Sequence, residues 1–355
     1  MSRPSIKDVA RQAECSVSTV SLVVNGRGNV SDETRARVMK VVHDLGYHAT
    51  RAARGLASRT SGNIGFILRD DHFSQAEPFY TRVFLGAEFA AREHNFYVLL
   101  ATVSHRFSDK KELPRFLLER NVDGIIIAGK VSHRFIDQCE GFGIPIVLVD
   151  FEVTRKRYAS ILIDNKAGAH AGVEHLIAAG HRDIAFVSGD IEHPSLADRL
   201  EGYKDALTEH GIAVQERLID TREPDSRIPN GASAMERLLK QRPFPTAVFA
   251  ANDATAIGCI QTLRARGLAI PGEVAVVGFD DVEMSSLMHP SLTTVRVFKE
   301  ELGRQAVNTI VDMIHNGDSV VVTKHLPVEL IVRESSALPA AVQAEPASPD
   351  RALRL

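Results

Sequence analysis

The sequence lacks a hydrophobic run long enough to cross a membrane and contains very little cysteine. A transmembrane helix needs roughly 20 apolar residues, and the polar N-terminus is unlike a signal peptide, so we expect a cytosolic protein. Cys15, Cys139 and Cys259 are scattered, which supports neither a disulfide framework nor a zinc site. With 355 residues, 44% apolar and 25% charged, the composition excludes fibrous and largely disordered proteins and allows more than one hydrophobic core.

Charge is distributed unevenly along the chain. Residues 1–60 carry ten Lys/Arg and five Asp/Glu, a net charge of +5, whereas the remainder carries 32 basic and 40 acidic residues, a net charge of −8. A small basic module therefore precedes a large acidic one. This arrangement is expected if only the first part contacts a polyanion such as DNA.

Three short amphipathic helices are predicted within the basic module. Ser5 can cap the first, Ser16 can cap a second at Val17–Val24, and Ser31 can cap a third at Asp32–Leu45. The short turn between the first two helices is typical of a helix-turn-helix motif. We therefore expect an all-α helix-turn-helix headpiece.

The second predicted helix has an outer face of small hydroxyl residues, Ser16, Ser18, Thr19 and Ser21. Such residues have poor helix propensity unless their hydroxyls cap the helix or bond an external group. Phosphates and base edges in a major groove are suitable external groups. The alternative is a solvated face with a single capping residue, which the flanking helices make less favourable.

Five collinear segments of the headpiece form a specific pattern: Ile6-Lys7-Asp8-Val9-Ala10, Ser16-Val17-Ser18-Thr19-Val20-Ser21, Val30-Ser31, Glu33-Thr34-Arg35 and Leu45-Gly46-Tyr47. With these segments the headpiece closely resembles that of the LacI/GalR family of bacterial transcription regulators. The resemblance implies a homodimer that places two copies of Val17–Val24 in successive major grooves of a pseudo-palindromic operator in double-stranded DNA. The headpiece residues that it implies in DNA binding are Ser16, Val17, Ser18, Thr19, Ser21, Leu22, Asn25, Ser31, Thr34 and Tyr47.

Two positions depart from the family pattern. Leu22 stands where many members carry an arginine that reads guanine, and a leucine offers only apolar contact, for example to a thymine methyl. The half-site is therefore expected to differ from the family's commonest one. Glu14 stands where glycine is usual in the turn, and its charge either weakens phosphate approach or points to solvent.

Residues 49–61 form a predicted hinge. Thr50 can cap one or two helical turns, but so short a helix needs a partner to be stable in water. The family resemblance implies that paired hinge helices enter the minor groove, where Leu56 wedges between base steps and Arg51, Ala53 and Arg54 contribute contacts. The alternative is a flexible basic linker with an incidental leucine.

The acidic remainder alternates short apolar runs with helical segments, which is typical of parallel sheets covered on both faces. The runs are Ile64–Leu68, Tyr97–Ala101, Ile125–Ala128, Ile146–Val149, Ile161–Ile163, Ile184–Val187, Ala247–Ala250 and Val274–Val277. They are too many for one compact sheet, so two α/β lobes are expected, with the topology of type I periplasmic binding proteins that the family resemblance implies. We expect the headpiece at 1–48, the first lobe at 62–160 and 291–322, the second lobe at 161–290 and 323–336, and a disordered tail at 337–355.

Polar residues follow several of these predicted strands and should converge at the carboxyl edge of the sheets, where α/β proteins bind ligands. Arg199 adds a fork of donors for a hydroxyl pair or a carboxylate. Some of these side chains must serve the fold instead, for example as helix caps. By resemblance to family motifs, the effector-binding residues are Phe79, Tyr80, Asp150, Ser195, Arg199, Asn252 and Asp280.

The expected ligand is a small effector, a carbohydrate or a sugar acid, and no cofactor or metal is expected. The segment from Asp220 to Arg227 lacks the aromatic ring that some relatives provide for a sugar or purine. It carries Arg222 and Arg227 instead, and their positive charges favour an acidic or phosphorylated sugar. An enzyme with a metal at His170 and Glu174 is a poor alternative, since no third ligand is evident. A solute-binding receptor without operator control is the main alternative, and the basic headpiece argues against it.

Overall fold

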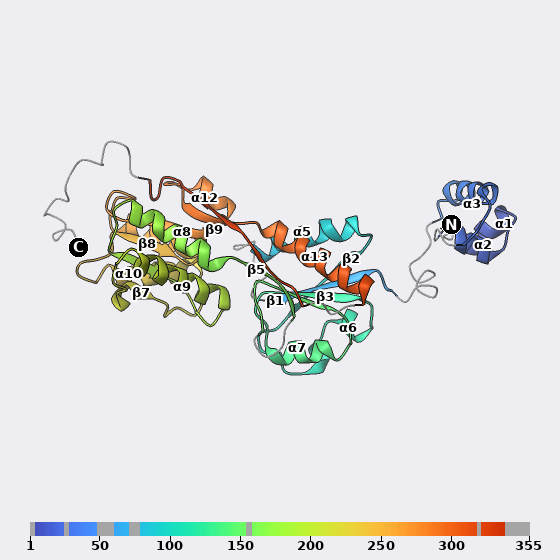
Figure 1. Cartoon of the computed structure of the whole chain (residues 1–355), viewed down its shortest axis with the longest axis horizontal. Helices are drawn as coiled ribbons and strands as arrows, with labels where there is room; N and C mark the ends of the chain where they lie inside the picture. Colours follow the sequence, from blue (N-terminus) through green and yellow to red (C-terminus); the bar gives the residue numbers. More distant parts are fainter. Residues whose placement is uncertain are drawn as a thin grey trace. The chain divides into compact units, whose positions relative to one another are not determined.

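The computed structural model describes residues 4–24, 28–47, 60–70, 79–153, 158–317 and 321–337. Its contacts divide the chain into two compact units. The first contains Met1–Asn63 with Asn121–Asp123, and the second contains Ile64–Arg120 with Gly124–Leu355. Figure 1 shows the elements of both units, which are described separately below.

The first unit contains the three predicted helices, α1 (Ile6–Gln12), α2 (Val17–Val24) and α3 (Asp32–Asp44). They pack around a small buried core to which Val9, Val20 and Val38 contribute, each fully buried. The predicted caps are confirmed for two helices: the Ser16 hydroxyl accepts the Thr19 amide at 3.0 Å, and Ser31 accepts the Thr34 amide at 3.4 Å. At the start of α1, the Ser5 amide donates to the Asp8 carboxylate at 2.9 Å, which completes a capping box.

The second unit contains two six-stranded sheets. The first sheet has the order β11-β5-β4-β3-β1-β2, and the second has the order β12-β10-β9-β8-β6-β7. The strands of the first sheet are β1 (Asn63–Arg69), β2 (Tyr97–Val103), β3 (Gly124–Ala128), β4 (Ile146–Val149), β5 (Ala159–Ile163) and β11 (Thr323–Leu326). Those of the second are β6 (Ile184–Val187), β7 (Ile219–Asp220), β8 (Ala247–Ala250), β9 (Ala275–Asp280), β10 (Thr293–Val297) and β12 (Val328–Ile331). The central pairs are parallel and β12 runs antiparallel to β10, which confirms the predicted two-lobed α/β architecture.

The chain crosses between the lobes later than the sequence predicted. Residues 161–163 belong to β5 in the first sheet, residues 293–297 form β10 in the second sheet, and residues 323–326 form β11 in the first sheet. The expected crossings at 160/161, 290/291 and 322/323 were therefore wrong. A short apolar run suits either sheet equally well, and only its hydrogen-bonded neighbour decides to which lobe it belongs.

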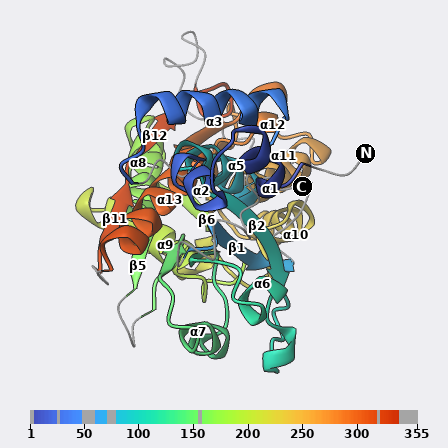
Figure 2. The same ribbon diagram turned by 90° about the vertical axis from the view of Figure 1, so that its right-hand side faces the viewer.

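Helices cover the faces of each sheet. In the first lobe, α5 (Phe79–Glu93) and α13 (Lys299–Asn316) lie on one face, and α6 (Arg115–Leu118) and α7 (His133–Glu140) lie on the other (Figure 1). In the second lobe, α8 (Asn165–Ala178) and α9 (Pro194–Glu209) lie opposite α10 (Ile228–Leu238) and α11 (Asp253–Ala265), as Figure 2 shows. The short helix α12 (Glu283–Leu287) and the 3-10 turns at Lys110–Glu112 and Glu216–Leu218 complete the fold. No helix in the described ranges is long and apolar enough to span a bilayer.

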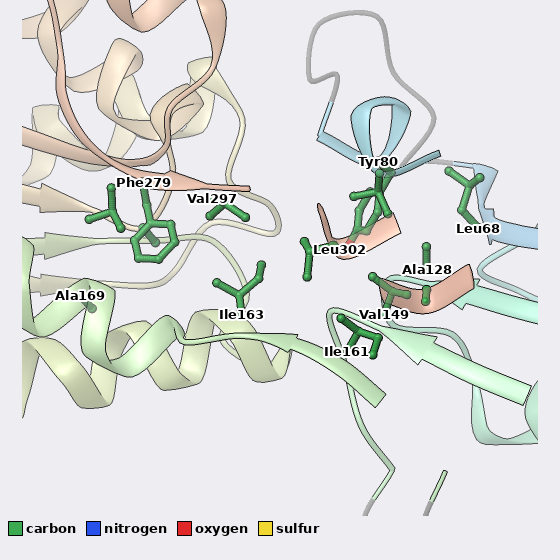
Figure 3. Close-up of a cluster of buried hydrophobic side chains, with 14 of the residues drawn as sticks. Leu68, Tyr80, Ala128, Val149, Ile161, Ile163, Ala169, Phe279, Val297 and Leu302 are labelled. Carbon is green, nitrogen blue, oxygen red and sulfur yellow. The ribbon is translucent and has the colours of Figure 1, made fainter. Parts of the chain in front are cut away.

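One set of buried apolar side chains draws on both lobes. It includes Tyr80, Val149 and Leu302 in the first lobe and Ala169 and Phe279 in the second (Figure 3). Several of its members stand at or just beside the carboxyl ends of strands. The polar residues of the candidate site are therefore fixed to a well-packed base.

The helices α5 and α13 approach each other very closely because glycines lie at their crossing. A Cβ atom placed on Gly303 would lie 1.9 Å from the carbonyl oxygen of Val83, and one placed on Gly86 would lie 1.9 Å from the carbonyl oxygen of Glu300. Each helix thus presents a glycine to the backbone of the other. Only a residue without a side chain fits at such a distance.

Glu14 adopts a positive φ of 51° in the turn after α1, at the position where the family pattern has glycine. A side chain in this left-handed region costs roughly 1 kcal/mol relative to glycine. We expect Glu14→Gly to raise the free energy of unfolding of the headpiece by about that amount, as measured by chemical denaturation. Glu14→Ala, which removes the charge but retains a Cβ, is the control. Equal stabilisation by both variants would show that charge, not backbone conformation, is responsible.

Candidate functional site

Asp150 forms the centre of a polar cluster at the carboxyl end of β4. Its backbone has a φ of 66°, and its side chain is buried. The Tyr80 hydroxyl donates to one carboxylate oxygen at 2.8 Å, and the Ser195 hydroxyl donates to the other at 2.7 Å. Burial, together with the neighbouring Asp150 charge, holds the pKa of Tyr80 well above its usual value, so its hydroxyl remains a donor. Because Tyr80 and Asp150 belong to the first lobe and Ser195 lies in the first turn of α9 of the second, this cluster joins the two lobes.

Arg199, on α9, is held in place by three neighbours. Its Nε donates to the Asn165 side-chain oxygen at 2.8 Å, and its Nη1 donates to the Ala251 carbonyl at 2.5 Å. Its guanidinium carbon lies 3.7 Å from the centre of the Phe279 ring, a cation–π contact. Asn165 lies two residues after the end of β5. It is one of the polar residues that the sequence placed at the strand ends, although it was not named as effector-binding.

Asp280 ends β9 with a φ of 110°, an unusual conformation for a residue with a side chain. Its Oδ1 lies 3.4 Å from Nη2 of Arg199 and accepts no hydrogen bond from the described part of the chain. Burial raises the pKa of this carboxyl, while the charges of Arg199 and Lys299 act in the opposite direction. A strained, buried carboxylate with an oxygen available for a donor is typical of a binding position.

Lys299 is a buried cation that the sequence interpretation missed. It is the first residue of α13, and its Nζ donates to the backbone carbonyl of Asp280. Its Nζ also lies 5.9 Å from the centre of the Phe79 ring. Since α13 belongs to the first lobe and Asp280 to the second, this is a further contact between the lobes.

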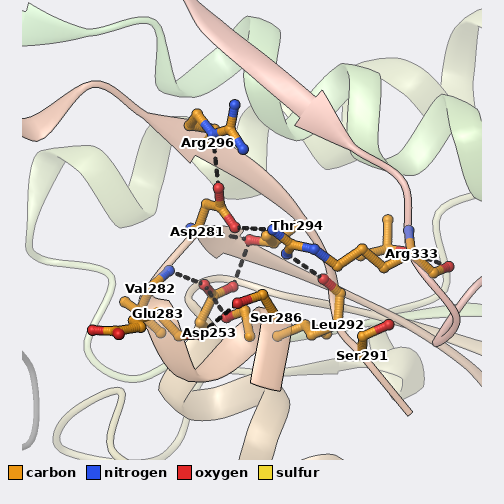
Figure 4. A network of polar contacts seen from close by, with 12 residues as sticks. Asp253, Asp281, Val282, Glu283, Ser286, Ser291, Leu292, Thr294, Arg296 and Arg333 are labelled. Carbon is orange, nitrogen blue, oxygen red and sulfur yellow. Dashed lines mark hydrogen bonds and ion pairs between the residues drawn. The ribbon is translucent and has the colours of Figure 1, made fainter. Parts of the chain in front are cut away.

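A polar network behind the site fixes the turn after β9 (Figure 4). The Asp253 carboxylate accepts hydrogen bonds from the Val282 amide at 2.9 Å, the Ser285 hydroxyl at 2.7 Å and the Thr294 hydroxyl at 2.5 Å. Asp281, with a φ of 53°, accepts Arg296 Nε at 2.7 Å and Arg333 Nη2 at 2.6 Å. The ion pairs of Asp281 thus come from two arginines that are distant in sequence and lie outside its own loop. Together these carboxylates hold Asp280 in its unusual conformation.

Complete burial and the nearby Asp280 charge raise the pKa of Asp253 to about 7 from 3.8. A raised pKa in the folded protein means that the protonated form is favoured there. The contribution of protonated Asp253 to the free energy of unfolding is therefore complete below pH 3.8 and is lost as the pH rises to about 7.

We expect Asp253→Asn to remove this pH dependence. Between pH 4 and pH 7 the free energy of unfolding of the unaltered protein should fall relative to the variant by on the order of 2 kcal/mol. Chemical denaturation of both proteins across this range measures the difference. A constant difference between them at all pH values would show that Asp253 ionises normally in the folded protein.

The two remaining predicted effector residues lie at helix starts. Phe79 begins α5, and its ring centre is 5.0 Å from that of Tyr80. Asn252 caps α11, because its side-chain oxygen accepts the Thr255 amide at 2.9 Å. Its oxygen therefore serves the fold, and its amide group is the part suited to a ligand.

The segment from Asp220 to Arg227 uses its arginines internally. Arg222 forms an ion pair with Asp220, which also accepts Arg237 Nε at 2.8 Å. Arg227 lies 3.7 Å from Asp225. The positive charges that suggested an acidic ligand are thus partly offset by adjacent carboxylates.

In the headpiece, α2 exposes two apolar side chains, Val17 at 42% and Leu22 at 41%. The hydroxyls of Ser18 and Thr19 bond that of Ser16, at 2.6 and 2.8 Å. Ser31 and Thr34 lie at the start of α3, where the Ser31 hydroxyl donates to that of Thr34 at 2.9 Å. Ser21 is half-buried on α2.

Tyr47 was expected to bind DNA, but its ring is only 6% exposed and belongs to the headpiece core. Its role in the structure is therefore packing, and a hydroxyl contact with DNA remains a prediction. Five other predicted DNA-binding residues lie outside the described residues. They are Asn25, Arg51, Ala53, Arg54 and Leu56.

His170 and Glu174, the residues of the disfavoured metal-site alternative, approach to 3.9 Å, and His170 Nε2 lies 2.8 Å from the Glu209 carboxylate. Within the described ranges, no group of three or more His, Cys, Asp or Glu side chains is arranged to hold a metal ion. His170 thus forms a surface hydrogen bond between α8 and α9.

A helix-turn-helix module and a two-lobed α/β domain with a polar cluster at its strand ends define a ligand-responsive DNA-binding regulator. Comparison with known proteins agrees. Residues 5–50 match "Bacterial regulatory proteins, lacI family", and residues 173–336 match "Periplasmic binding protein-like domain".

Catabolite control protein A of Priestia megaterium is 34% identical over 94% of this chain and 99% of its own length. The ribose operon repressor of Haemophilus influenzae is 32% identical over 93% and 98%. Among solved structures, the lac repressor dimer bound to operator is 29% identical, with a TM-score of 0.80, covering 95% of this chain and 100% of that one. The chain therefore belongs to the lacI family of bacterial regulatory proteins and is a DNA-binding transcriptional regulator, not an enzyme.

Proposed function

We propose that this regulator is a repressor whose affinity for operator DNA is controlled by a small molecule held between its two lobes. The cluster around Asp150, Arg199 and Asp280 supports this proposal most directly, because it brings polar groups from both lobes to one place. The headpiece and the relatives argue against a solute receptor without operator control. On operator DNA the protein would be associated with the nucleoid.

We propose an uncharged, polyhydroxylated effector such as a sugar. Asp150 and Asp280 accept hydrogen bonds and Arg199 donates them, which suits hydroxyl groups. Arg222 forms an ion pair with Asp220, so its positive charge is largely neutralised and no longer favours an acidic sugar. Among similar structures, CelR was solved as a cellobiose complex and a lacI-family regulator from Enterococcus faecium was solved with bound ribose. Calorimetry with neutral sugars and matched sugar acids tests the class, and binding of sugar acids alone would contradict it.

The effector would act through the lobes. Contacts such as Ser195 to Asp150 depend on how the lobes are oriented, so a ligand that alters them alters that orientation. We propose that this change brings the hinge segments of a dimer together or separates them. Couplings of this kind are typically 1–3 kcal/mol.

A homodimer is supported by the similarity of this chain to the lac repressor, which was solved as a dimer bound to operator. Both lobes also expose single large apolar side chains. Phe89 on α5 is 49% exposed, Tyr97 on β2 is 63% exposed and Leu287 on α12 is 72% exposed. Sedimentation analysis measures the oligomeric state, and a monomer at micromolar concentration would contradict the proposal.

Sequencing the genomic DNA that co-purifies with the protein tests operator binding directly. Enrichment of a pseudo-palindromic site is the expected result, and the neighbouring genes would provide candidate effectors. Recovery of random fragments only would contradict sequence-specific control.

Leu56→Ala tests the proposed minor-groove wedge. We expect specific operator affinity to fall by roughly tenfold, because the lost apolar wedge no longer supports the kinked duplex. Non-specific, salt-dependent binding to random duplex should change little, since it depends on phosphate contacts. A gel-shift titration with both duplexes measures the two effects. An equal loss on both would rule out the wedge assignment.

A further inference from the structure

Asp123 lies where the predicted hinge ends and the first strand begins. Its Oδ1 accepts the backbone amide of Ser61 at 2.6 Å, and its Oδ2 accepts the backbone amide of Gly62 at 2.7 Å. Both carboxylate oxygens are thus used on two consecutive amides. Hydrogen bonds from backbone N–H groups to a charged carboxylate are among the stronger ones in proteins.

The backbone at Gly62 makes this arrangement possible. Its φ is 68°, in the left-handed region that favours glycine. A residue in the left-handed conformation turns its own N–H group and that of the preceding residue towards one point. The two N–H groups then form a concavity that binds an anion. Here the anion is the chain's own carboxylate.

Further hydrogen bonds tie the same two segments together. The Asn63 side-chain amide donates to the Asn121 carbonyl at 2.9 Å, and the Asp123 amide donates to the Asn63 carbonyl at 2.9 Å. Contacts group residues 121–123 with the N-terminal segment of the chain rather than with their own sequence neighbours. The residue after Asp123 is Gly124, the first of β3. The end of the hinge is therefore attached to the entrance of a central strand.

We propose that Asp123 is a positioning residue for operator binding, which fixes the point and direction at which the hinge leaves the effector domain. Movements of the first lobe then reach residues 49–61 through the Asp123 carboxylate. Without the carboxylate, the amides of Ser61 and Gly62 lose their acceptor, the end of the hinge is less constrained, and the two headpieces of a dimer sample more separations. This inference rests on the proposed operator binding.

The test compares Asp123→Asn with the unaltered full-length protein. The isosteric amide retains one acceptor oxygen but replaces the other with a donor that faces a backbone N–H. Hydrogen exchange of the peptide spanning residues 60–66 should become at least roughly tenfold faster at the amides of Ser61 and Gly62. Affinity for the operator recovered from co-purified DNA should fall by about tenfold, with random-duplex affinity unchanged.

Asp109→Asn is the matched control. The Asp109 carboxylate also accepts a backbone amide, that of Lys111 at 2.9 Å, at the start of the 3-10 turn Lys110–Glu112 in the second unit. This variant should alter neither local exchange at residues 60–66 nor operator affinity. Gly62→Ala approaches the same attachment from the hinge side, because alanine is strained at this φ, and it should reproduce the effects of Asp123→Asn. It also provides the test if Asp123→Asn does not fold.

Each result decides the inference. Faster exchange with unchanged operator affinity would overturn it, because the attachment would then be structural only. Unchanged exchange would overturn it as well, because the carboxylate would not hold the hinge. If the unaltered protein prefers no duplex, operator binding itself fails, and that result is visible without any variant.

Discussion

Arg199→Leu should abolish effector binding and destabilise the effector domain. The leucine leaves the Asn165 side-chain oxygen, the Ala251 carbonyl and the Asp280 carboxylate without their buried cation. Removal of one partner from a buried ionic group costs about 3–5 kcal/mol, and loss of a charged donor to a ligand should weaken binding at least roughly 100-fold. Chemical denaturation and calorimetry with the identified sugar measure the two effects.

The pH dependence of this variant identifies the cause. Asp280 already has a raised pKa, and without Arg199 it should protonate more readily still. The loss of stability should therefore be smaller at acidic pH than at neutral pH. Arg199→Lys retains the charge but not the planar fork, so it should recover part of the stability and little of the binding. Full binding by the leucine variant would exclude Arg199 from the effector site.

Gly303→Val should strongly destabilise the first lobe. The position of its Cβ would be 1.9 Å from the Val83 carbonyl oxygen, so α5 and α13 would have to move apart. Overpacking of this kind costs about 3 kcal/mol or more when backbone is the obstacle. Thermal unfolding by calorimetry should show a decrease in Tm of roughly 10 °C.

Gly272→Ala is the matched control for the glycine prediction. A Cβ at Gly272 would meet only the Cβ of Ala269, at 3.4 Å, an ordinary contact. This variant should unfold at the temperature of the unaltered protein. An unchanged Tm for Gly303→Val would mean that the two helices can separate without cost, which would contradict the close crossing described above.

The sequence allowed prediction of the elements that depend on local pattern. The limits of α2 agree with those predicted, and Ser16 and Ser31 cap their helices as expected, since a cap needs only residues three or four positions away. Strands such as β4 and β6 could also be predicted from the sequence, because four consecutive apolar residues between polar turns are typical of a short buried strand.

The sequence did not allow prediction of features that depend on distant partners. The crossings between lobes were misplaced because β10 is assigned by its pairing with β9 and β12. Lys299 was missed because its role consists of a contact with Asp280, which is distant in sequence. For the same reason Asn165 was placed at a strand end but not recognised as a partner of Arg199. Family resemblance supplied the candidate residues of the site, and geometry was needed to show how their side chains are held.

The order of the last two strands has a consequence for the integrity of the molecule. Thr323–Leu326 supplies the outermost strand of one sheet, and Val328–Ile331 supplies the outermost strand of the other. A single premature stop near position 320 would therefore strip an edge from both lobes at once and leave their neighbouring strands open to aggregation. Proteolytic loss of this short stretch would have the same effect, so the edges of both sheets depend on a single segment near the end of the described chain.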